Sequence, residues 1–239
     1  KKYLFDVDGT LTAPREMMDS VFATFFLSWM EDKEVYLVAG STKEYVHQQI
    51  PSDILSEVSG LFCSMGNELW QDDSLVYSND WDLPLDVKDY LYGFRRTSEY
   101  IENEFVPSVG PVIQHRTGMV NFSVIGRDAD SEAREAYFVW DNEHGERATI
   151  TEAMQSRFPD LDMRIGGQIS IDVQPKGNNK SLASKWIREN GGGEMVFFGD
   201  KCSEPGNDYD IVLDIEEHGD GESHSVSNYN ETWDLLQSL

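Results

Sequence analysis

The sequence predicts an α/β fold, a doubly wound parallel sheet interrupted by an inserted α+β segment. Near both ends of the chain, apolar strand-like runs alternate with helical apolar spacing. Between about residues 81 and 175, strand-like runs of alternating polarity follow one another closely, which indicates an antiparallel sheet. After residue 177 the first pattern returns. We therefore assign residues 1–80 and 176–239 to one core and residues 81–175 to the insertion.

The first part of the core reads as strand, helix, strand, helix, strand. Residues 2–7 form a buried strand, and residues 16–31 have helical apolar spacing. Residues 34–39 form a second strand that ends in Gly40-Ser41-Thr42, where Ser41 or Thr42 could cap the following helix. Residues 60–64 form a third strand. This alternation is typical of a parallel sheet.

The insertion and the last part of the core follow. In the insertion we expect helices over residues 86–104, 131–140 and 149–158, and strands over 111–115, 118–125 and 169–173. In the core we expect a helix over 179–189, a buried strand over 195–198 and a further strand over 210–214. Residues 216–223 are acidic and contain glycine, so we interpret them as a surface loop.

The composition excludes several classes of protein. With 44 acidic and 19 basic residues the net charge is −25, which argues against a nucleic-acid partner because phosphates would be repelled. Apolar runs are too short to span a membrane, and the first residues show no secretory signal. Cys63 and Cys202 are far apart in sequence, which fits a reducing compartment. We expect a cytoplasmic protein.

Polar residues gather where the predicted parallel strands end, which is where open sheets of this kind bind ligands. Asp6 and Asp8 follow the first strand, Ser41 follows the second, and Asp200 follows the strand at 195–198. Because converging carboxylates need a counter-charge, we predict Mg²⁺ with oxygen ligands. One carboxylate of the first pair would then attack phosphorus, and the other would pass a proton. Ser41 and Lys180 would hold phosphoryl oxygens.

The insertion carries a second set of polar candidates. Alternation along residues 169–173 puts Ser170 and Asp172 on one strand face, where they could bind sugar hydroxyls. Arginine suits bidentate phosphate binding. The arginines singled out for this role are Arg116, Arg127 and Arg134 in the insertion and Arg15 shortly after the first aspartate pair.

Four motifs carry a resemblance to a known family. FDVDGTLT, VAGST, Lys180 and FFGDKCSEPGND, in this order, resemble the motifs of the haloacid dehalogenase (HAD) superfamily of phosphotransferases, and the insertion resembles that superfamily's C2-type cap. DGTLTAPR, HRTGMVNFSVIGR and GGQISIDVQP are similar to stretches of the eukaryotic-type phosphomannomutases. The resemblance covers nearly the whole chain and implies a HAD-like core with an inserted cap.

The resemblance also implies roles for individual residues. It assigns the nucleophile to Asp6 and the general acid/base to Asp8, with Ser41 and Lys180 as the other catalytic residues. The implied metal set is Asp6, Asp8, Asp200 and Asp208, in which Asp208 orients either the ligands or Lys180. The implied sugar-phosphate ligands are Arg15, Arg116, Arg127, Arg134, Ser170 and Asp172. A further cation site of the family maps near Val212, Asp214 and Glu217.

The activity implied by this family is the interconversion of mannose 6-phosphate and mannose 1-phosphate, with a hexose 1,6-bisphosphate as activator and Mg²⁺ as cofactor. Glucose phosphates are possible further substrates, and a homodimer through the cap is a further expectation. A sugar-phosphate phosphatase of the same superfamily is the first alternative, because it would share the catalytic residues. A second alternative is a binding module without catalysis. Arg116, Arg127 and Arg134 favour the mutase over the phosphatase, because a phosphatase does not need to bind a second phosphate group.

Overall fold

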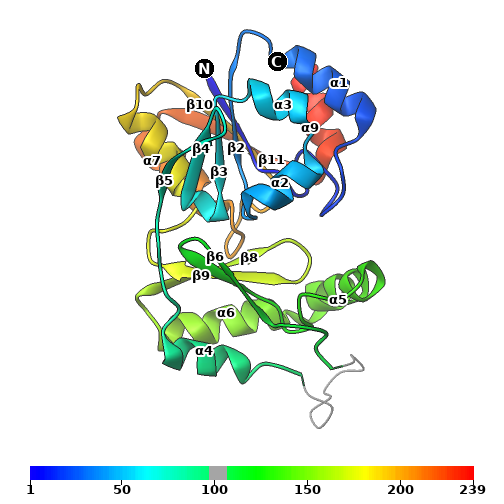
Figure 1. Ribbon diagram of the computed structural model, residues 1–239, viewed down its shortest axis with the longest axis vertical. Coiled ribbons are helices and arrows are strands. Elements are labelled where there is room, and N and C mark those ends of the chain that lie inside the picture. Colours follow the sequence, from blue (N-terminus) through cyan, green and yellow to red (C-terminus); the bar gives the residue numbers. More distant parts are fainter. Residues whose placement is uncertain (97–106) are drawn as a thin grey trace. The chain divides into compact units, whose positions relative to one another are not determined.

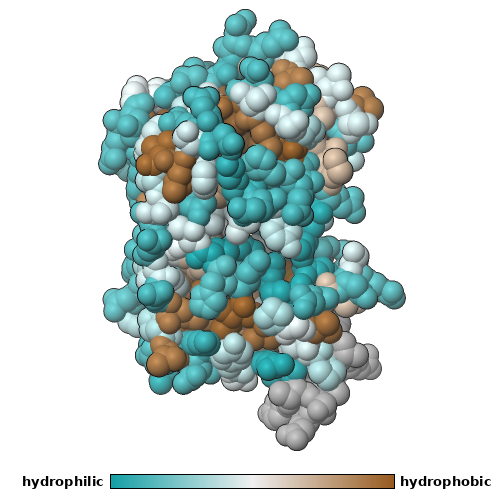
Figure 2. Space-filling view, viewed as in Figure 1, coloured by the Kyte–Doolittle hydropathy of each residue, from teal (hydrophilic) through white to brown (hydrophobic). Residues whose placement is uncertain are grey.

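The computed structural model describes residues 1–96 and 107–239, and these form two compact units. We call Lys1–Asn79 together with Gly177–Leu239 the core unit, and Asp80–Lys176 the inserted unit (Figure 1). Each boundary lies one residue from the position expected from the sequence. Hydrophilic residues cover much of the surface seen in Figure 2, as the acidic composition requires. Among the described residues, helices are too short or too polar to cross a membrane.

The core unit is built on a seven-stranded sheet with the order β11-β10-β1-β2-β3-β4-β5. Its first five strands in this order run parallel, and β4 and β5 are added antiparallel at one edge. This confirms the predicted parallel core. The strands are β1 Lys2–Phe5, β2 Glu34–Val38, β3 Gly60–Cys63, β4 Glu68–Gln71, β5 Ser74–Ser78, β10 Met195–Gly199 and β11 Gly221–Ser225.

Both faces of this sheet are buried because side chains alternate along each strand. Phe5 and Leu37 belong to one apolar cluster, which also contains side chains of α1, α2, α3 and α9. Leu4 and Phe197 belong to the other, together with side chains of α7 and α8. The helices are α1 Ser20–Trp29, α2 Lys43–Gln49, α3 Ser52–Glu57, α7 Ser181–Glu189, α8 Tyr209–His218 and α9 Tyr229–Leu236, with a 3₁₀ turn at Ser64–Gly66.

The inserted unit contains a four-stranded antiparallel sheet with the order β6-β7-β9-β8. This confirms the antiparallel insertion. One face of the sheet is apolar and packs with Leu91 of α4 and with Ile150 and Met154 of α6. The elements are β6 Ile113–Arg116, β7 Met119–Phe122, β8 Leu161–Gly166, β9 Ser170–Pro175, α4 Leu85–Tyr92, α5 Ser131–His144 and α6 Glu146–Arg157.

The strand predicted over residues 210–214 is wrong, because these residues lie in α8. Ile211, Asp214 and Ile215 are buried at the spacing of one helical face, and Gly219 ends the helix in the left-handed conformation. The surface loop predicted over 216–223 is wrong for the same region. It contains the end of α8 and the start of β11, a polar strand at the sheet edge.

The helix predicted over residues 86–104 is wrong in its length. In the structure α4 ends at Tyr92, and the N–H groups of Gly93 and Phe94 close turns onto the preceding residues. The part of this prediction that covers residues 97–104 lies outside the described residues.

Candidate functional site

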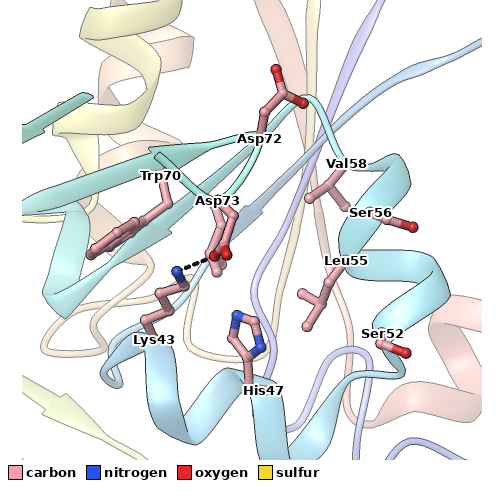
Figure 3. Close-up of a pocket in the computed structure, with 10 residues that line it drawn as sticks. Lys43, His47, Ser52, Leu55, Ser56, Val58, Trp70, Asp72 and Asp73 are labelled. Atoms are coloured by element: carbon pink, nitrogen blue, oxygen red, sulfur yellow. Dashed lines mark hydrogen bonds and ion pairs between the residues drawn. The ribbon is translucent and has the colours of Figure 1, made fainter. Parts of the chain in front are cut away.

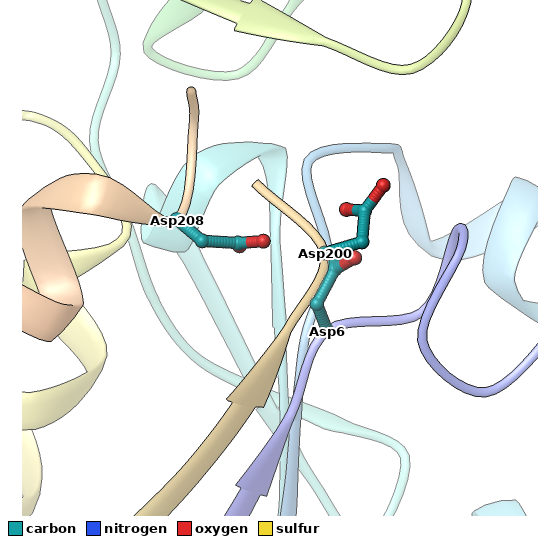
Figure 4. A group of neighbouring side chains, drawn as sticks. All are labelled: Asp6, Asp200 and Asp208. Carbon is teal, nitrogen blue, oxygen red and sulfur yellow. The ribbon is translucent and has the colours of Figure 1, made fainter. Parts of the chain in front are cut away.

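Three carboxylates meet at the carboxyl-terminal edge of the parallel sheet (Figure 4). Asp6 and Asp200 directly follow β1 and β10, which are neighbours, and the Asp6 N–H donates to the Phe198 carbonyl at 2.9 Å. Asp208 is the residue before α8. One oxygen from each of the three carboxylates lies within 4.8 Å of the others. The parallel order of the strands thus brings together acidic residues that are almost 200 positions apart in sequence.

Lys180 supplies a positive charge at the centre of this group. Its ammonium group is completely buried and donates to Asp6 Oδ1 at 2.5 Å and to Asp208 Oδ1 at 2.6 Å. The other oxygen of Asp208 accepts the Lys201 N–H at 2.9 Å, so both Asp208 oxygens are bound. Lys201 Nζ pairs with Asp200 Oδ2 at 2.9 Å. Three carboxylates therefore share two ammonium groups.

Burial and neighbouring charges shift the pKa values of Asp6, Asp200 and Lys180. Burial raises the pKa of the Asp6 carboxyl well above its usual range, although Lys180 acts in the opposite direction. Burial also raises the pKa of Asp200 to about 6, against the effect of Lys201. For Lys180, burial disfavours the charged form, but Asp208 and Asp6 outweigh this effect and raise its pKa. The cluster carries more negative charge than its lysines balance, and a divalent cation with oxygen ligands fits this donor set.

The turn after Asp6 needs a glycine for two reasons. Gly9 has φ +86°, a conformation that residues with a side chain rarely adopt. A Cβ atom at this position would lie 2.6 Å from Asp200 Oδ2. The turn also brings Thr10 Oγ1 to 3.4 Å from Asp6 Oδ2. Gly9 therefore lets the main chain pass close to the carboxylate group.

Asp8 lies on the same loop but has different partners. Its Oδ1 accepts the Arg15 N–H at 2.7 Å and the side-chain N–H of Gln49 at 2.6 Å. The Arg15 guanidinium group donates to the Tyr45 hydroxyl at 2.6 Å. The metal set expected from the sequence includes Asp8, but the group of three carboxylates does not contain it. The structure thus separates the two aspartates of the first motif into different surroundings.

Ser41 follows β2, the neighbour of β1 on the side opposite to β10. Its carbonyl accepts the Ser64 N–H at 2.8 Å, which holds the loop after β2. The sheet order β10-β1-β2 therefore places Asp200, Asp6 and Ser41 in this order along one edge.

The polar face of the inserted sheet contains a connected network. Arg127 donates to Ser170 Oγ at 2.9 Å, and Ser170 Oγ donates to Asn121 Oδ1 at 3.1 Å. Asn121 Nδ2 donates to Asp172 Oδ1 at 2.7 Å, and Arg116 lies 3.9 Å from the same oxygen. The structure thus links four of the predicted sugar-phosphate ligands through Asn121.

Arg134 has a different arrangement from Arg116 and Arg127. It is buried in α5, and its Nε donates to the Ala129 carbonyl at 2.6 Å. Its Nη2 donates to the Arg127 carbonyl. Arg134 therefore holds the turn that carries Arg127, and two of its N–H directions point to main-chain carbonyl groups.

Sequence reasoning missed Asn121 and Gln49. A signal for Asn121 was present, since it is the polar residue of the otherwise apolar run MVNF. Gln49 ends α2, and its 2% exposure could not be inferred from a helix whose other residues are mostly polar. Its contact with Asp8 depends on packing between elements 41 residues apart.

The region near Val212, Asp214 and Glu217, where a further cation was expected, lies in α8. Asp214 accepts hydrogen bonds from Ser184 Oγ at 2.5 Å and from Arg188 at 3.0 Å. A guanidinium group therefore supplies positive charge to this carboxylate.

The core unit also has a pocket of about 340 Å³, whose lining residues are drawn in Figure 3. Lys43 and His47 of α2 face it, together with Trp70, and the Lys43 ammonium lies 3.9 Å from the centre of the Trp70 ring. Asp73 forms an ion pair with Lys43. None of the ten lining residues belongs to the predicted site. Lys43 and His47 of helix α2 thus line the pocket, whereas Tyr45 and Gln49 of the same helix contact Arg15 and Asp8.

Comparison with known proteins finds relatives over the whole chain. A family model described as eukaryotic phosphomannomutase matches residues 22–239. Phosphomannomutase 1 of Dictyostelium discoideum is 33% identical over 88% of this chain and 86% of its own length. Phosphomannomutase of Saccharomyces cerevisiae is 32% identical over 99% of this chain and 92% of its own. A haloacid dehalogenase-like hydrolase from Bacteroides thetaiotaomicron has the same fold, with a TM-score of 0.58, 13% identity and coverage of 100% and 98%.

Proposed function

The chain belongs to the eukaryotic phosphomannomutase family, and from this premise we propose that it interconverts mannose 6-phosphate and mannose 1-phosphate. The observation that carries the proposal is the buried group of Asp6, Lys180, Asp200 and Asp208 at the sheet edge. A carboxylate held by an ammonium group at the end of a parallel strand is suited to attack a phosphoryl group. The proposal includes an aspartyl phosphate and a hexose 1,6-bisphosphate as intermediates.

In this proposal Asp6 is the nucleophile, and Asp8 is the general acid and base. Lys180 orients Asp6 through its hydrogen bond to Oδ1, and Oδ2, which among the described residues has only the long 3.4 Å contact with the Thr10 hydroxyl, is the oxygen that would attack phosphorus. Ser41 and Lys180 bind the non-bridging phosphoryl oxygens and offset charge as it develops. The separation of Asp8 from the carboxylate group supports its different role, because a proton carrier cannot also be held as a metal ligand through the same oxygen.

The residues that would hold Mg²⁺ are Asp6 and Asp200, with Asp208 in support because both of its oxygens already accept N–H groups. When bound, Mg²⁺ supplies positive charge that offsets the repulsion between carboxylates and phosphate. The raised pKa values of Asp6 and Asp200 are consistent with this assignment, because burial and the neighbouring carboxylates both disfavour an uncompensated negative charge here.

The inserted unit is proposed to bind the phosphate group that is not reacting. Arg116 and Arg127 supply guanidinium groups, and Ser170 and Asp172 supply partners for sugar hydroxyls. Arg134 supports Arg127 through its main-chain carbonyl. Each end of the bisphosphate would then meet Asp6 in turn.

We also propose a cytoplasmic location, a homodimer through the inserted unit, activation by a hexose 1,6-bisphosphate and a role in supplying mannose 1-phosphate for GDP-mannose synthesis.

A coupled assay tests this proposal. The protein is given mannose 1-phosphate with and without Mg²⁺ and glucose 1,6-bisphosphate, and both mannose 6-phosphate and inorganic phosphate are measured. The proposal predicts formation of mannose 6-phosphate that depends on both additions and exceeds phosphate release. Phosphate release without stimulation by the bisphosphate would instead identify a sugar-phosphate phosphatase, and tight binding without turnover would identify a binding protein.

A further inference from the structure

The Asp8 carboxylate is bound asymmetrically. Both hydrogen bonds that the described residues donate to it arrive at Oδ1, one from the Arg15 N–H at 2.7 Å and one from Gln49 Nε2 at 2.6 Å. The amide of Gln49 must present its nitrogen here, because its oxygen would face a carboxylate oxygen at the same distance. Two donors use the lone pairs of Oδ1 that lie near the carboxylate plane. The oxygen suited to carry a proton is therefore Oδ2.

Gln49 is held rigidly enough to impose this asymmetry. Its side chain is buried with 2% exposure, and the same Nε2 lies 3.3 Å from Thr12 Oγ1. Its main-chain carbonyl accepts the Met18 N–H at 2.8 Å. Side chain and main chain thus connect the end of α2 to both ends of the segment that follows Asp8. A rotamer fixed in this way loses little entropy when substrate binds.

A second contact from α2 reaches the same loop. The Tyr45 hydroxyl accepts from the Arg15 guanidinium group at 2.6 Å, and the guanidinium carbon lies 5.2 Å from the centre of the Tyr45 ring. Arg15 itself has φ +64°, so its N–H is directed at Asp8 by a strained main chain. Helix α2 therefore stabilises both donors of Asp8 Oδ1, one directly and one through Tyr45.

We infer that Gln49 is a positioning residue for proton transfer by Asp8. Gln49 and the Arg15 N–H hold Oδ1, so that the proton is carried on Oδ2. When the Asp6–phosphorus bond forms and the bond from phosphorus to the leaving sugar oxygen breaks, the Oδ2–H proton passes to that oxygen. In the return step Oδ2 takes the proton of the attacking sugar hydroxyl while the Asp6–phosphorus bond breaks. The inference rests on the proposed function, because it requires Asp8 to be the acid and base.

The test uses aryl phosphates whose leaving groups differ in their need for a proton. Phenyl phosphate has a basic leaving group that requires protonation, and 2,4-dinitrophenyl phosphate has a stable anionic one that does not. Gln49→Met keeps the length of the side chain and removes its donor. Gln49→Glu keeps the shape and places an acceptor against Asp8. His47→Gln is the matched control, since His47 lies on the same helix and lines the pocket of Figure 3.

The inference predicts unequal losses in kcat/KM. For Gln49→Met we expect a loss of about 10- to 100-fold with phenyl phosphate and less than about 3-fold with the dinitrophenyl ester. The first loss is smaller than most of the about 10²- to 10⁴-fold that acid–base catalysis supplies, because Asp8 itself is still present. Gln49→Glu should show the same inequality with a larger loss. His47→Gln should match the unmodified protein on both substrates. Thermal unfolding of each variant shows whether the fold is kept.

Equal losses on both substrates for Gln49→Met and Gln49→Glu would overturn the inference. Gln49 would then only stabilise the loop that follows Asp8. Asp8→Asn separates this failure from a failure of the proposed function. If Asp8→Asn shows the leaving-group inequality and the Gln49 variants do not, only the inference is wrong. If Asp8→Asn also loses activity equally on both substrates, Asp8 is not the general acid, and the proposed roles are wrong as well.

Discussion

The carboxylate group of the core unit and the Asn121 network of the inserted unit both bury charged side chains, but their contacts differ. In the core, Lys180 touches two carboxylates at 2.5 and 2.6 Å, and a third carboxylate, Asp200, lies beside them. In the inserted unit, Arg127 donates to a hydroxyl, and Arg116 lies 3.9 Å from its carboxylate. In the core cluster three carboxylates share two ammonium groups, whereas in the inserted network a hydroxyl group and an amide group lie between Arg127 and the Asp172 carboxylate. This difference fits the proposed roles of the two units, reaction chemistry in the core and phosphate recognition in the insertion.

The largest effect should come from Asp6→Asn, which tests the reactive role proposed for the carboxylate group of the core unit. An amide of the same size cannot form the phosphoenzyme, and loss of a nucleophile that acts within a catalytic unit lowers kcat by about 10⁴-fold or more. Mutase assays and thermal unfolding measure this effect. Asp234→Asn in α9, an exposed position, is the control and should keep full activity. Turnover by Asp6→Asn near that of the control would refute the assignment of the nucleophile.

Lys180→Met tests how strongly the core charges depend on one ammonium group. Removing it leaves Asp6 and Asp208 buried without their shared partner, and breaking a buried pair in this way costs about 3–5 kcal/mol of unfolding free energy. Urea denaturation measures the loss. Adding Asp208→Asn to Lys180→Met should recover part of the stability, because one buried charge is then removed. If Lys180→Met alone is as stable as the original protein, the carboxylates of the cluster do not depend on the Lys180 charge.

Arg127→Ala tests whether the inserted unit binds the phosphate group that is not reacting. The loss of hydrogen bonds to a charged ligand should remove about 1.5–3 kcal/mol of binding, or roughly 10- to 100-fold in kcat/KM for mannose 1-phosphate. Hydrolysis of phenyl phosphate, which has no second phosphate-binding requirement, should change by less than about 3-fold on the same principle. Losses of the same size on both substrates would mean that Arg127 does not bind the distal phosphate.

An effect of about the same size is expected for the response of stability to Mg²⁺. At 100 times its Kd a ligand adds about 2.7 kcal/mol to the unfolding free energy, which raises Tm by roughly 5–10 °C in a chain of this size. Asp200→Asn should remove most of this rise and should raise the Tm of the metal-free protein. A rise of the same size in Asp200→Asn would exclude Asp200 as a ligand.

The pH dependence of this response follows from the direction of the Asp200 shift. The pKa of Asp200 is raised from 3.8 to about 6 in the folded protein, so the metal-free fold binds more protons than the unfolded chain between these values. Its stability contribution therefore falls as pH rises from about 4 to about 6, and Mg²⁺ should compensate for this loss. The rise in Tm caused by Mg²⁺ should accordingly be larger at pH 7.5 than at pH 5.

Elements with strong apolar patterns were predictable from the sequence, and polar ones were not. The runs KYLF, EVYLV and MVFFG identify the central strands because both faces of a parallel strand are buried. The edge strand β11 reads GESHS and has no apolar signal. The β4–β5 hairpin turns at Asp72 and Asp73, both with positive φ, instead of at a glycine pair. The run IVL in α8 is too short to distinguish strand from helix by periodicity.

The candidate site shows the same division. The approach of Asp6 to Asp200 follows from strand order, which the motifs indicate, and it was predictable for that reason. The partners of Asp8 and Arg134 depend on side-chain packing between α2, α5 and the loops they contact. Sequence spacing carries no information about such contacts, so neither Gln49 nor the main-chain role of Arg134 could be predicted.

The most direct test of the account is to find the residue that becomes phosphorylated. The protein is mixed with radiolabelled glucose 1,6-bisphosphate and Mg²⁺, quenched rapidly in acid and mapped by peptide mass spectrometry. The account predicts an acyl phosphate on Asp6, which is absent from Asp6→Asn and depends on Mg²⁺. A phosphate on any other residue, or mutase turnover without a phosphorylated Asp6, would contradict it.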